Sequence, residues 1–66
     1  MNVVMNGQPY EVAENSTIAA LLDALQLAPH QVAVEVNLEL VPRAQHAEHV
    51  LQQGDRLEVV TLVGGG

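Results

Sequence analysis

Only one stretch of the chain has the period of an amphipathic helix, and the stretches on both sides of it alternate as strands do. Apolar residues recur at intervals of three and four in Ile18, Leu21, Leu22 and Leu25. They form one stripe of a helix that we expect over 17–27. Its N-cap lies within 15–17, and Pro29 ends it, because the residue before a proline avoids the helical region. A single helix covers one face of a small sheet, which limits the fold to one helical layer on one sheet.

The remaining segments predict the strands of that sheet. Asn6-Gly7 separates two short alternating runs and is a strong hairpin signal, because a type I′ turn needs positive φ at both central residues. Pro9 lies at the start of the second run, which suggests a strand at the sheet edge. Further elements are expected at 32–37 (strand), 38–41 (strand), 43–49 (one helical turn) and 56–63 (strand).

The pattern as a whole predicts one α+β domain. It spans 1–63 and holds a four- to five-stranded sheet with the helix packed on one face, and a flexible glycine tail at 64–66 follows. A chain of 66 residues buries enough surface for one core but has little room for an internal substrate pocket. Tyr10 is the only aromatic residue, so the core has to be aliphatic.

The composition excludes several classes of site. The chain has no cysteine and no lysine, so disulfides, thiolate metal sites and cysteine or lysine nucleophiles are excluded. A formal net charge of −6 disfavours nucleic acid; it either steers the chain toward a basic partner or simply keeps it soluble. No stretch is long and apolar enough to cross a bilayer, and the first residues lack the basic start of a signal peptide. We therefore expect a cytoplasmic protein without membrane contact.

No group of side chains supports catalysis by this chain alone. Ser16 lies where a helix cap is expected, and the glycines of the two turns are too far apart for a phosphate loop. His46 and His49, with Glu48, are spaced so that a helical turn would present two imidazoles on one face. Without a third and fourth ligand, we interpret them as a solvated polar turn and expect neither a metal site nor a bound cofactor.

The last predicted strand is apolar on both faces. Leu57 and Val59 lie on one face, which we assign to the helix, and Val60 and Leu62 lie on the other. Strands that are apolar on both faces are usually covered on both, but no segment of the chain remains to cover the second face. Either loops cover Val60 and Leu62 loosely, or the two residues form an exposed patch that binds a partner, and we favour the patch because the three glycines follow directly.

Val63 leads from this strand directly into Gly64, Gly65 and Gly66. Glycines lack side chains and can enter a channel that is too narrow for other residues. The final carboxylate is ionised at neutral pH and stays unreactive until one of its oxygens becomes a leaving group. A partner that uses ATP supplies this by forming an acyl-adenylate. We expect Val63, Gly64 and Gly65 to bind the partner and Gly66 to carry the reactive group.

Five segments carry a family resemblance. They are Asn6-Gly7, the helix over 17–27, 36–43 (Val-Asn-Leu-Glu-Leu-Val-Pro-Arg), 53–60 (Gln-Gly-Asp-Arg-Leu-Glu-Val-Val) and 62–66 (Leu-Val-Gly-Gly-Gly). Together they resemble the ThiS family of ubiquitin-like sulfur carriers over essentially the whole chain. The resemblance implies a β-grasp fold with a mixed sheet, in which the first and last strands are parallel and adjacent at the centre. Leu38 and His46 depart from the family pattern, which favours a small or polar residue and a large aromatic there.

The resemblance also implies that the chain is a carrier and not an enzyme. An adenylating enzyme (ThiF-like) that uses ATP and magnesium would activate the carboxylate of Gly66. A sulfur donor such as a cysteine desulfurase would supply the sulfur of a thiocarboxylate. Thiazole synthase (ThiG-like) would then take this sulfur to form the thiazole of thiamine. The absence of cysteine fits this role, because sulfur cannot travel on a side chain.

Three alternatives stay open at this point. The small subunit of molybdopterin synthase shares the fold and the terminal chemistry, but tends to be longer. A sulfur carrier of another pathway, such as tRNA or amino-acid thiolation, would differ in its partners. A protein-interaction module with an inert tail would tolerate loss of the final glycines.

Overall fold

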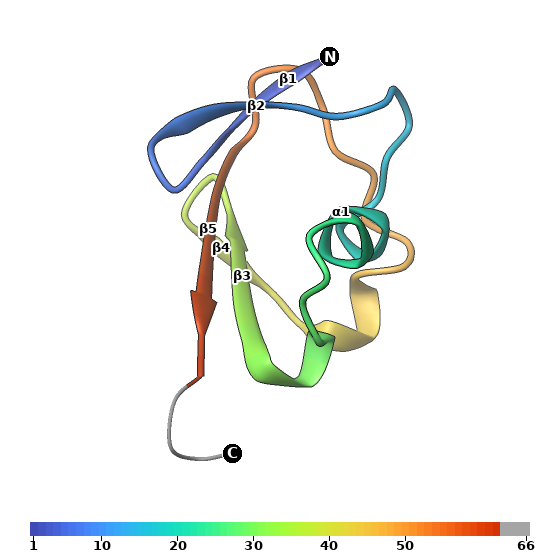
Figure 1. The fold of residues 1–66 in the computed structure, drawn as a ribbon, viewed down its shortest axis with the longest axis vertical. Coiled ribbons are helices and arrows are strands. Elements are labelled where there is room, and N and C mark those ends of the chain that lie inside the picture. The colour runs from blue at the N-terminus through green and yellow to red at the C-terminus, as the bar shows by residue number, and fades with distance from the viewer. Residues whose placement is uncertain (63–66) are drawn as a thin grey trace.

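The computed structural model describes residues 1–62, which form a five-stranded sheet with one short helix against it (Figure 1). The strand order is β2-β1-β5-β3-β4. The strands are β1 (Asn2–Met5), β2 (Gln8–Glu11), β3 (Val32–Val36), β4 (Glu39–Val41) and β5 (Arg56–Thr61). The helix is α1 (Ile18–Ala24), and two 3₁₀ turns are η1 (Pro29–Gln31) and η2 (Arg43–Gln45).

The sheet is mixed, as the sequence predicted. β1 and β5 are parallel and adjacent at the centre, and every other neighbouring pair is antiparallel. β2 lies at one edge of the sheet, where the missing N–H of Pro9 removes no hydrogen bond between strands. The sequence did not predict η1, and β2 and β4 are shorter than expected. The predicted end of the last strand at Val63 lies outside the described residues.

The helix begins where the sequence predicted but ends earlier. Thr17 is the N-cap, and its Oγ1 accepts a hydrogen bond from Ala20 N at 3.1 Å. The expected end near Leu27 is wrong, because Gln26 turns into the left-handed region with φ +60. Gln26 N donates to Asp23 O at 3.0 Å and Leu27 N donates to Leu22 O at 2.9 Å. These two bonds form a Schellman motif, with glutamine where glycine is usual.

The core is aliphatic and lies between α1 and one face of the sheet. Ile18, Leu22 and Val34 are fully buried at its centre. It also takes in Leu51, which follows η2 and is 1% exposed. The other buried members are Val3, Val12, Leu21, Val32, Val36, Val41 and Leu57. Because α1 has seven residues, the loop around Leu51 completes the cover of this inner face.

The prediction of a solvated turn around His46 is wrong. His46 is 3% exposed, and its Nε2 lies 3.0 Å from the carbonyl oxygen of Val41. Since a carbonyl oxygen only accepts, Nε2 carries the hydrogen, and the buried Nδ1 has no hydrogen-bond partner among residues 1–62. The chain between β4 and β5 crosses the start of α1, where His46 O accepts from Ala19 N and His49 O accepts from Ile18 N. These bonds satisfy free N–H groups of the helix and hold His46 inward.

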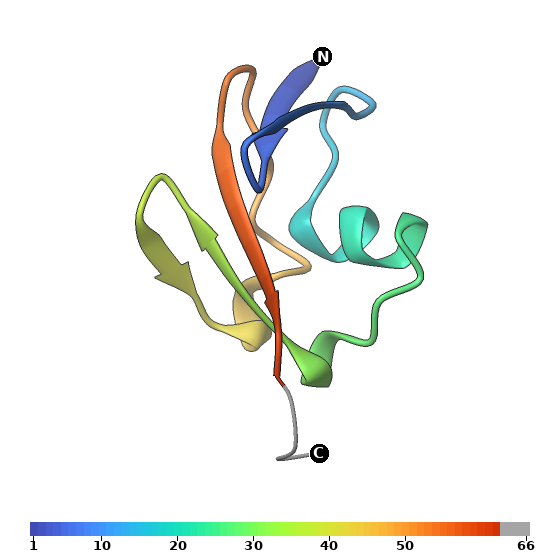
Figure 2. The same cartoon turned by 60° about the vertical axis from the view of Figure 1, so that its left-hand side comes forward.

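The other face of the sheet is left uncovered by the described residues. Figure 1 shows α1 and the η2 loop on the same side of β3, β4 and β5, and Figure 2 shows α1 standing clear of the strands on that side. The exposed large apolar side chains of the chain include Leu38, Leu40, Val60 and Leu62. We call this uncovered side the outer face.

Two hairpins with two-residue turns flank β5. In the first, Asn6 and Gly7 have φ +52 and +81, and in the second, Asn37 and Leu38 have φ +52 and +72. Both turns therefore have the backbone sign of a type I′ turn. Gly7 adopts this conformation without cost, but Leu38 has a Cβ and is strained by roughly 1–2 kcal/mol. Its side chain is 89% exposed, so no packing offsets the strain.

We predict that Leu38→Gly stabilises the fold. The expected gain is about 0.5–1 kcal/mol, because the steric strain of a positive φ exceeds the entropic cost of glycine. The melting temperature would rise by roughly 2–6 °C, which circular dichroism measures directly. Leu40→Gly is the matched control, since Leu40 is also exposed but lies in β4, where glycine destabilises. A lower melting temperature for Leu38→Gly would contradict the strain.

Candidate functional site

The predicted functional residues lie on β5 and on the chain that follows it. β5 is the middle strand of the sheet, with β1 on one side and β3 on the other. Its inner side chain Leu57 is 1% exposed, and Val59 is half-buried beside it. The strand runs away from the chain's N-terminus toward the opposite end of the molecule (Figure 1). The strand that leads toward the tail is therefore anchored in the core through Leu57.

A side chain from the first hairpin extends the ladder between β1 and β5. The Oδ1 atom of Asn6 accepts from Val59 N at 2.8 Å, and its Nδ2 donates to Val59 O at 3.1 Å. The Asn6 backbone N also donates to Leu57 O at 2.8 Å. Asn6 thus pairs with β5 as a further strand residue would, after β1 has ended at Met5.

The second hairpin holds the start of β5 from the other side. Asn37 Oδ1 accepts from Arg56 N at 3.0 Å, and Asn37 N donates to Arg56 O at 2.7 Å. Asn37 Nδ2 donates to Asp55 Oδ1 at 3.0 Å, and Asp55 Oδ2 accepts from Gln52 N at 2.8 Å. The two asparagines, each at positive φ in its turn, fix the register of β5 on both edges.

The last described residue continues the pairing with the β3 side. Leu62 N donates to Gln31 O at 2.7 Å, one residue beyond the pair formed by Val32 and Thr61. The 3₁₀ turn η1, which the sequence did not predict, supplies this acceptor. The chain is therefore held by a hydrogen bond up to its last described residue, Leu62.

The outward side chains of β5 change character along the strand. Arg56 and Glu58 come first and are exposed, and Val60 and Leu62 follow with 56% and 54% of their surfaces exposed. The expected exposure of Val60 and Leu62 is thus confirmed. Leu40, which is 64% exposed, adds an apolar side chain from β4 that the sequence analysis missed. The alternation of the strand could have predicted this exposure, because neighbouring residues of a strand point to opposite faces and Val41 faces the core.

Two glutamates face each other on this outer face. Glu35 and Glu58 are directly opposite in the register of β3 and β5, and both are exposed. On the side of β3 away from β5, Glu35 lies directly opposite Leu40 of β4. Like charges in directly opposite positions destabilise a sheet by a few tenths of a kcal/mol or more. A cation from a partner would relieve this repulsion, so the outer face favours a basic, partly apolar partner.

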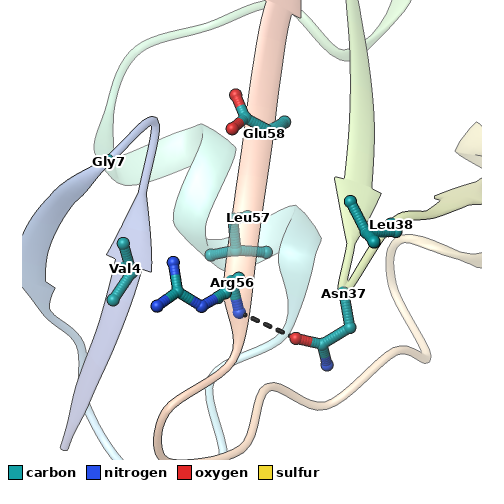
Figure 3. A pocket seen from close by; sticks show the side chains of 7 residues that line it. All are labelled: Val4, Gly7, Asn37, Leu38, Arg56, Leu57 and Glu58. Carbon is teal, nitrogen blue, oxygen red and sulfur yellow. Dashed lines mark hydrogen bonds between the residues drawn. The ribbon is translucent and has the colours of Figure 1, made fainter.

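A hollow of ≈ 230 Å³ lies between the two hairpins, beside Glu58 (Figure 3). The guanidinium of Arg56 extends across it toward Val4, and Leu38 borders it from the second hairpin. Its remaining lining comes from Gly7, Asn37, Leu57 and Glu58. The hollow gives the outer face a depression that a side chain of a partner can enter.

The structure brings together Val60 and Leu62 from the predicted site, while Val63, Gly64, Gly65 and Gly66 lie outside the described residues. The roles of Asn6 and Asn37 were missed by sequence reasoning, which used the first only as a turn signal. Within residues 1–62, no three histidine or carboxylate side chains are grouped as metal ligands. No helix in this part of the chain is long and apolar enough to span a membrane.

Comparison with known proteins places these features in a family. The ThiS family matches residues 3–66. This chain belongs to the ThiS family. It is 32% identical to the sulfur carrier protein ThiS of Escherichia coli over 100% of both chains. It is 36% identical to the thiamine biosynthesis protein ThiS of Geobacter metallireducens, whose crystal structure superposes with a TM-score of 0.85 over 100% of both chains.

A second kind of ThiS relative is much longer. The thiazole synthase of Paramagnetospirillum magneticum is 41% identical to this chain over 66 residues. This chain spans only 20% of the length of that synthase, and the same share of the thiazole synthase of Magnetococcus marinus. The matches together confirm the predicted family, the β-grasp fold and the class of carrier protein.

We predict that Asn37→Ala lowers the free energy of unfolding by about 1–3 kcal/mol. The change removes two side-chain hydrogen bonds to Asp55 and Arg56 and places an alanine at positive φ. Asn37→Gly is the matched control, because it removes the same bonds without strain and should cost less. Urea unfolding measures both. Equal stability of Asn37→Ala and the unmodified chain would contradict the role of Asn37 at β5.

Proposed function

We propose that this chain, by its family a sulfur carrier of thiamine biosynthesis, carries sulfur as a thiocarboxylate on Gly66. The observation that carries the proposal is the fixed end of β5, which is bonded to Asn6 at Val59 and to Gln31 at Leu62. Gly66 follows four residues later, within roughly 14 Å of Leu62 at full extension. The reactive end is therefore tethered to a rigid base over a short distance.

The chemistry replaces one carboxylate oxygen by sulfur. A carboxylate oxygen of Gly66 attacks the α-phosphorus of ATP, and pyrophosphate leaves. A sulfur nucleophile at the oxidation level of hydrosulfide then attacks the carbonyl carbon, and AMP leaves with the original oxygen. The product is a thiocarboxylate. A thiocarboxylate gives up its sulfur to an acceptor more readily than a carboxylate gives up an oxygen. Glycine suits both steps, because it has no side chain to obstruct the attacking group.

The enzymes of these steps are separate proteins in the proposal. An adenylating enzyme (ThiF-like) binds ATP and magnesium. A sulfur donor such as a cysteine desulfurase supplies the sulfur as a persulfide, and a thiol reductant releases it as hydrosulfide while forming a disulfide. Thiazole synthase (ThiG-like) receives it, which is supported by thiazole synthases that contain a segment similar to this chain. That support also favours thiamine over molybdopterin as the pathway. The proposal assigns no cofactor to the carrier itself.

The outer face supplies the docking surface in this proposal. Val60 and Leu62 provide apolar contact next to the tail, and Leu40 extends it across β3. The opposed Glu35 and Glu58 provide negative charge beside that contact. With a net charge of −6, the carrier associates faster with a basic partner surface than a neutral protein would.

Tail variants test the proposal. Deleting Gly66, or adding one alanine after it, should abolish thiazole formation in a reaction reconstituted from the carrier, the adenylating enzyme, ATP, magnesium, sulfide and thiazole synthase. The fold should be retained, with the free energy of unfolding changed by at most ~0.5 kcal/mol, because the tail lies beyond the core strand. Intact mass of each purified variant verifies its last residue. Full activity of the variant that lacks Gly66 would refute the proposal and favour an interaction module.

Charging the outer face should weaken binding more than stability. Val60→Asp or Leu62→Asp is expected to reduce the affinity for the adenylating enzyme by about tenfold or more, while the free energy of unfolding changes by less than about 1 kcal/mol. Val50→Asp is the matched control, because Val50 is 42% exposed but lies away from β5. Titration calorimetry measures the affinity. Equal affinities for all three variants would argue against the outer face as the docking surface.

A further inference from the structure

The backbone groups of β5 alternate strictly between its two neighbours. Asp55 O accepts from Val4 N, Leu57 O accepts from Asn6 N, and both backbone groups of Val59 bond to the Asn6 side chain. All three residues therefore direct their polar groups toward the first hairpin. The alternate residues face β3 instead, as the bonds of Arg56 to Asn37 and of Leu62 to Gln31 show.

This alternation assigns the backbone of Thr61 to an open edge. Because the period of a strand is two, the N–H and C=O of Thr61 point to the same side as those of Val59. On that side β1 has already ended at Met5, and Asn6 has used its amide on Val59. Figure 1 shows the first hairpin beside the upper part of β5, with the lower end of β5 projecting beyond it. The described residues thus leave one donor and one acceptor of a central strand facing solvent.

We propose that the open edge of β5 at Thr61 pairs with an extended backbone segment of thiazole synthase, which adds a short strand beside β5. This inference rests on the proposed function, in which the synthase takes up the tail. Unpaired strand edges are common templates for such β-augmentation, since main-chain hydrogen bonds provide affinity without requiring particular side chains. Asn6 marks where the added strand has to stop, because its side chain already fills the next position.

The position of the edge argues for the enzyme that encloses the tail. Gly66 lies five residues beyond Thr61, so a protein that grips Gly66 is at most about 17 Å from the open edge. Val60 and Leu62 on either side of Thr61 are exposed apolar residues of the outer face. An added strand would therefore lie next to the docking surface formed by Val60 and Leu62, so a single partner could contact both.

A second copy of this chain is a poorer occupant of the same edge. Each copy has a formal net charge of −6, so edge-to-edge pairing would bring two strongly negative molecules together. The synthase is supported instead by the homologous thiazole synthases that hold both parts in one chain, where the segment similar to this chain is always near its partner.

Amide hydrogen exchange of the full chain, with and without the thiazole synthase of the same organism, tests the proposal. In the free chain, Thr61 N–H should exchange much faster than Leu62 N–H, which is bonded to Gln31 O. In the complex, the exchange of Thr61 should slow by at least about tenfold, as expected for a newly formed backbone hydrogen bond. Leu62 serves as the internal control.

Two substitutions separate backbone pairing from a contact of the side chain. Thr61→Pro removes the N–H that faces the open edge and leaves the β3 ladder intact, so the chain should still fold. Its affinity for the synthase should fall by about tenfold or more. Thr61→Val keeps the N–H and removes only the hydroxyl, and it should bind as the unmodified chain does. Equal loss in both variants would overturn the proposal.

The possible outcomes distinguish this inference from the proposed function. A complex in which Thr61 exchange is unchanged overturns the edge pairing, while carrier activity of the tail stands. Protection of Thr61 that rises with carrier concentration in the absence of the synthase overturns it in favour of a second copy. The absence of any complex overturns both the edge pairing and the assignment of thiazole synthase as partner. Loss of activity on deletion of Gly66 is independent of all three.

Discussion

A helix of seven residues has to cover a five-stranded sheet, and this constraint determines most of the molecule. The helix covers one face, and the loop that carries His46 and Leu51 completes the cover by bonding to the start of the helix. No described segment remains for the other face, so the central strand β5 is buried on one side and exposed on the other. The same strand therefore belongs both to the core and to the surface that a partner can reach.

The central position of β5 in the sheet fixes the chain up to its last described residue, Leu62. Two asparagines at positive φ, Asn6 and Asn37, hold the strand from opposite sides with their side-chain amides. Their backbone conformation and their hydrogen bonds are linked, because the tight turn is what directs each amide at β5. The stability of the two hairpins and the register of β5 are thus coupled through the same residues.

Much of this arrangement could be predicted from the sequence, because it follows from local periodicity. The helix start at Thr17, the hairpin at Asn6 and the alternation of β3 and β5 depend on neighbours in the chain. The errors arose where distant contacts decide. His46, for example, is buried by a loop that crosses the helix. The early end of the helix is a local exception, because Gln26 adopts a left-handed conformation without being glycine. The bonds from Asn6 to Val59 join residues 53 positions apart and have no local signal.

The central claim is that Gly66 carries sulfur, and the most direct test is the intact mass of the carrier after incubation with the adenylating enzyme, ATP, magnesium and sulfide. Replacement of one carboxylate oxygen by sulfur predicts a gain of about 16 mass units that fragmentation locates at Gly66. An unchanged mass in the presence of an active adenylating enzyme, or a gain located at any other residue, would contradict the account.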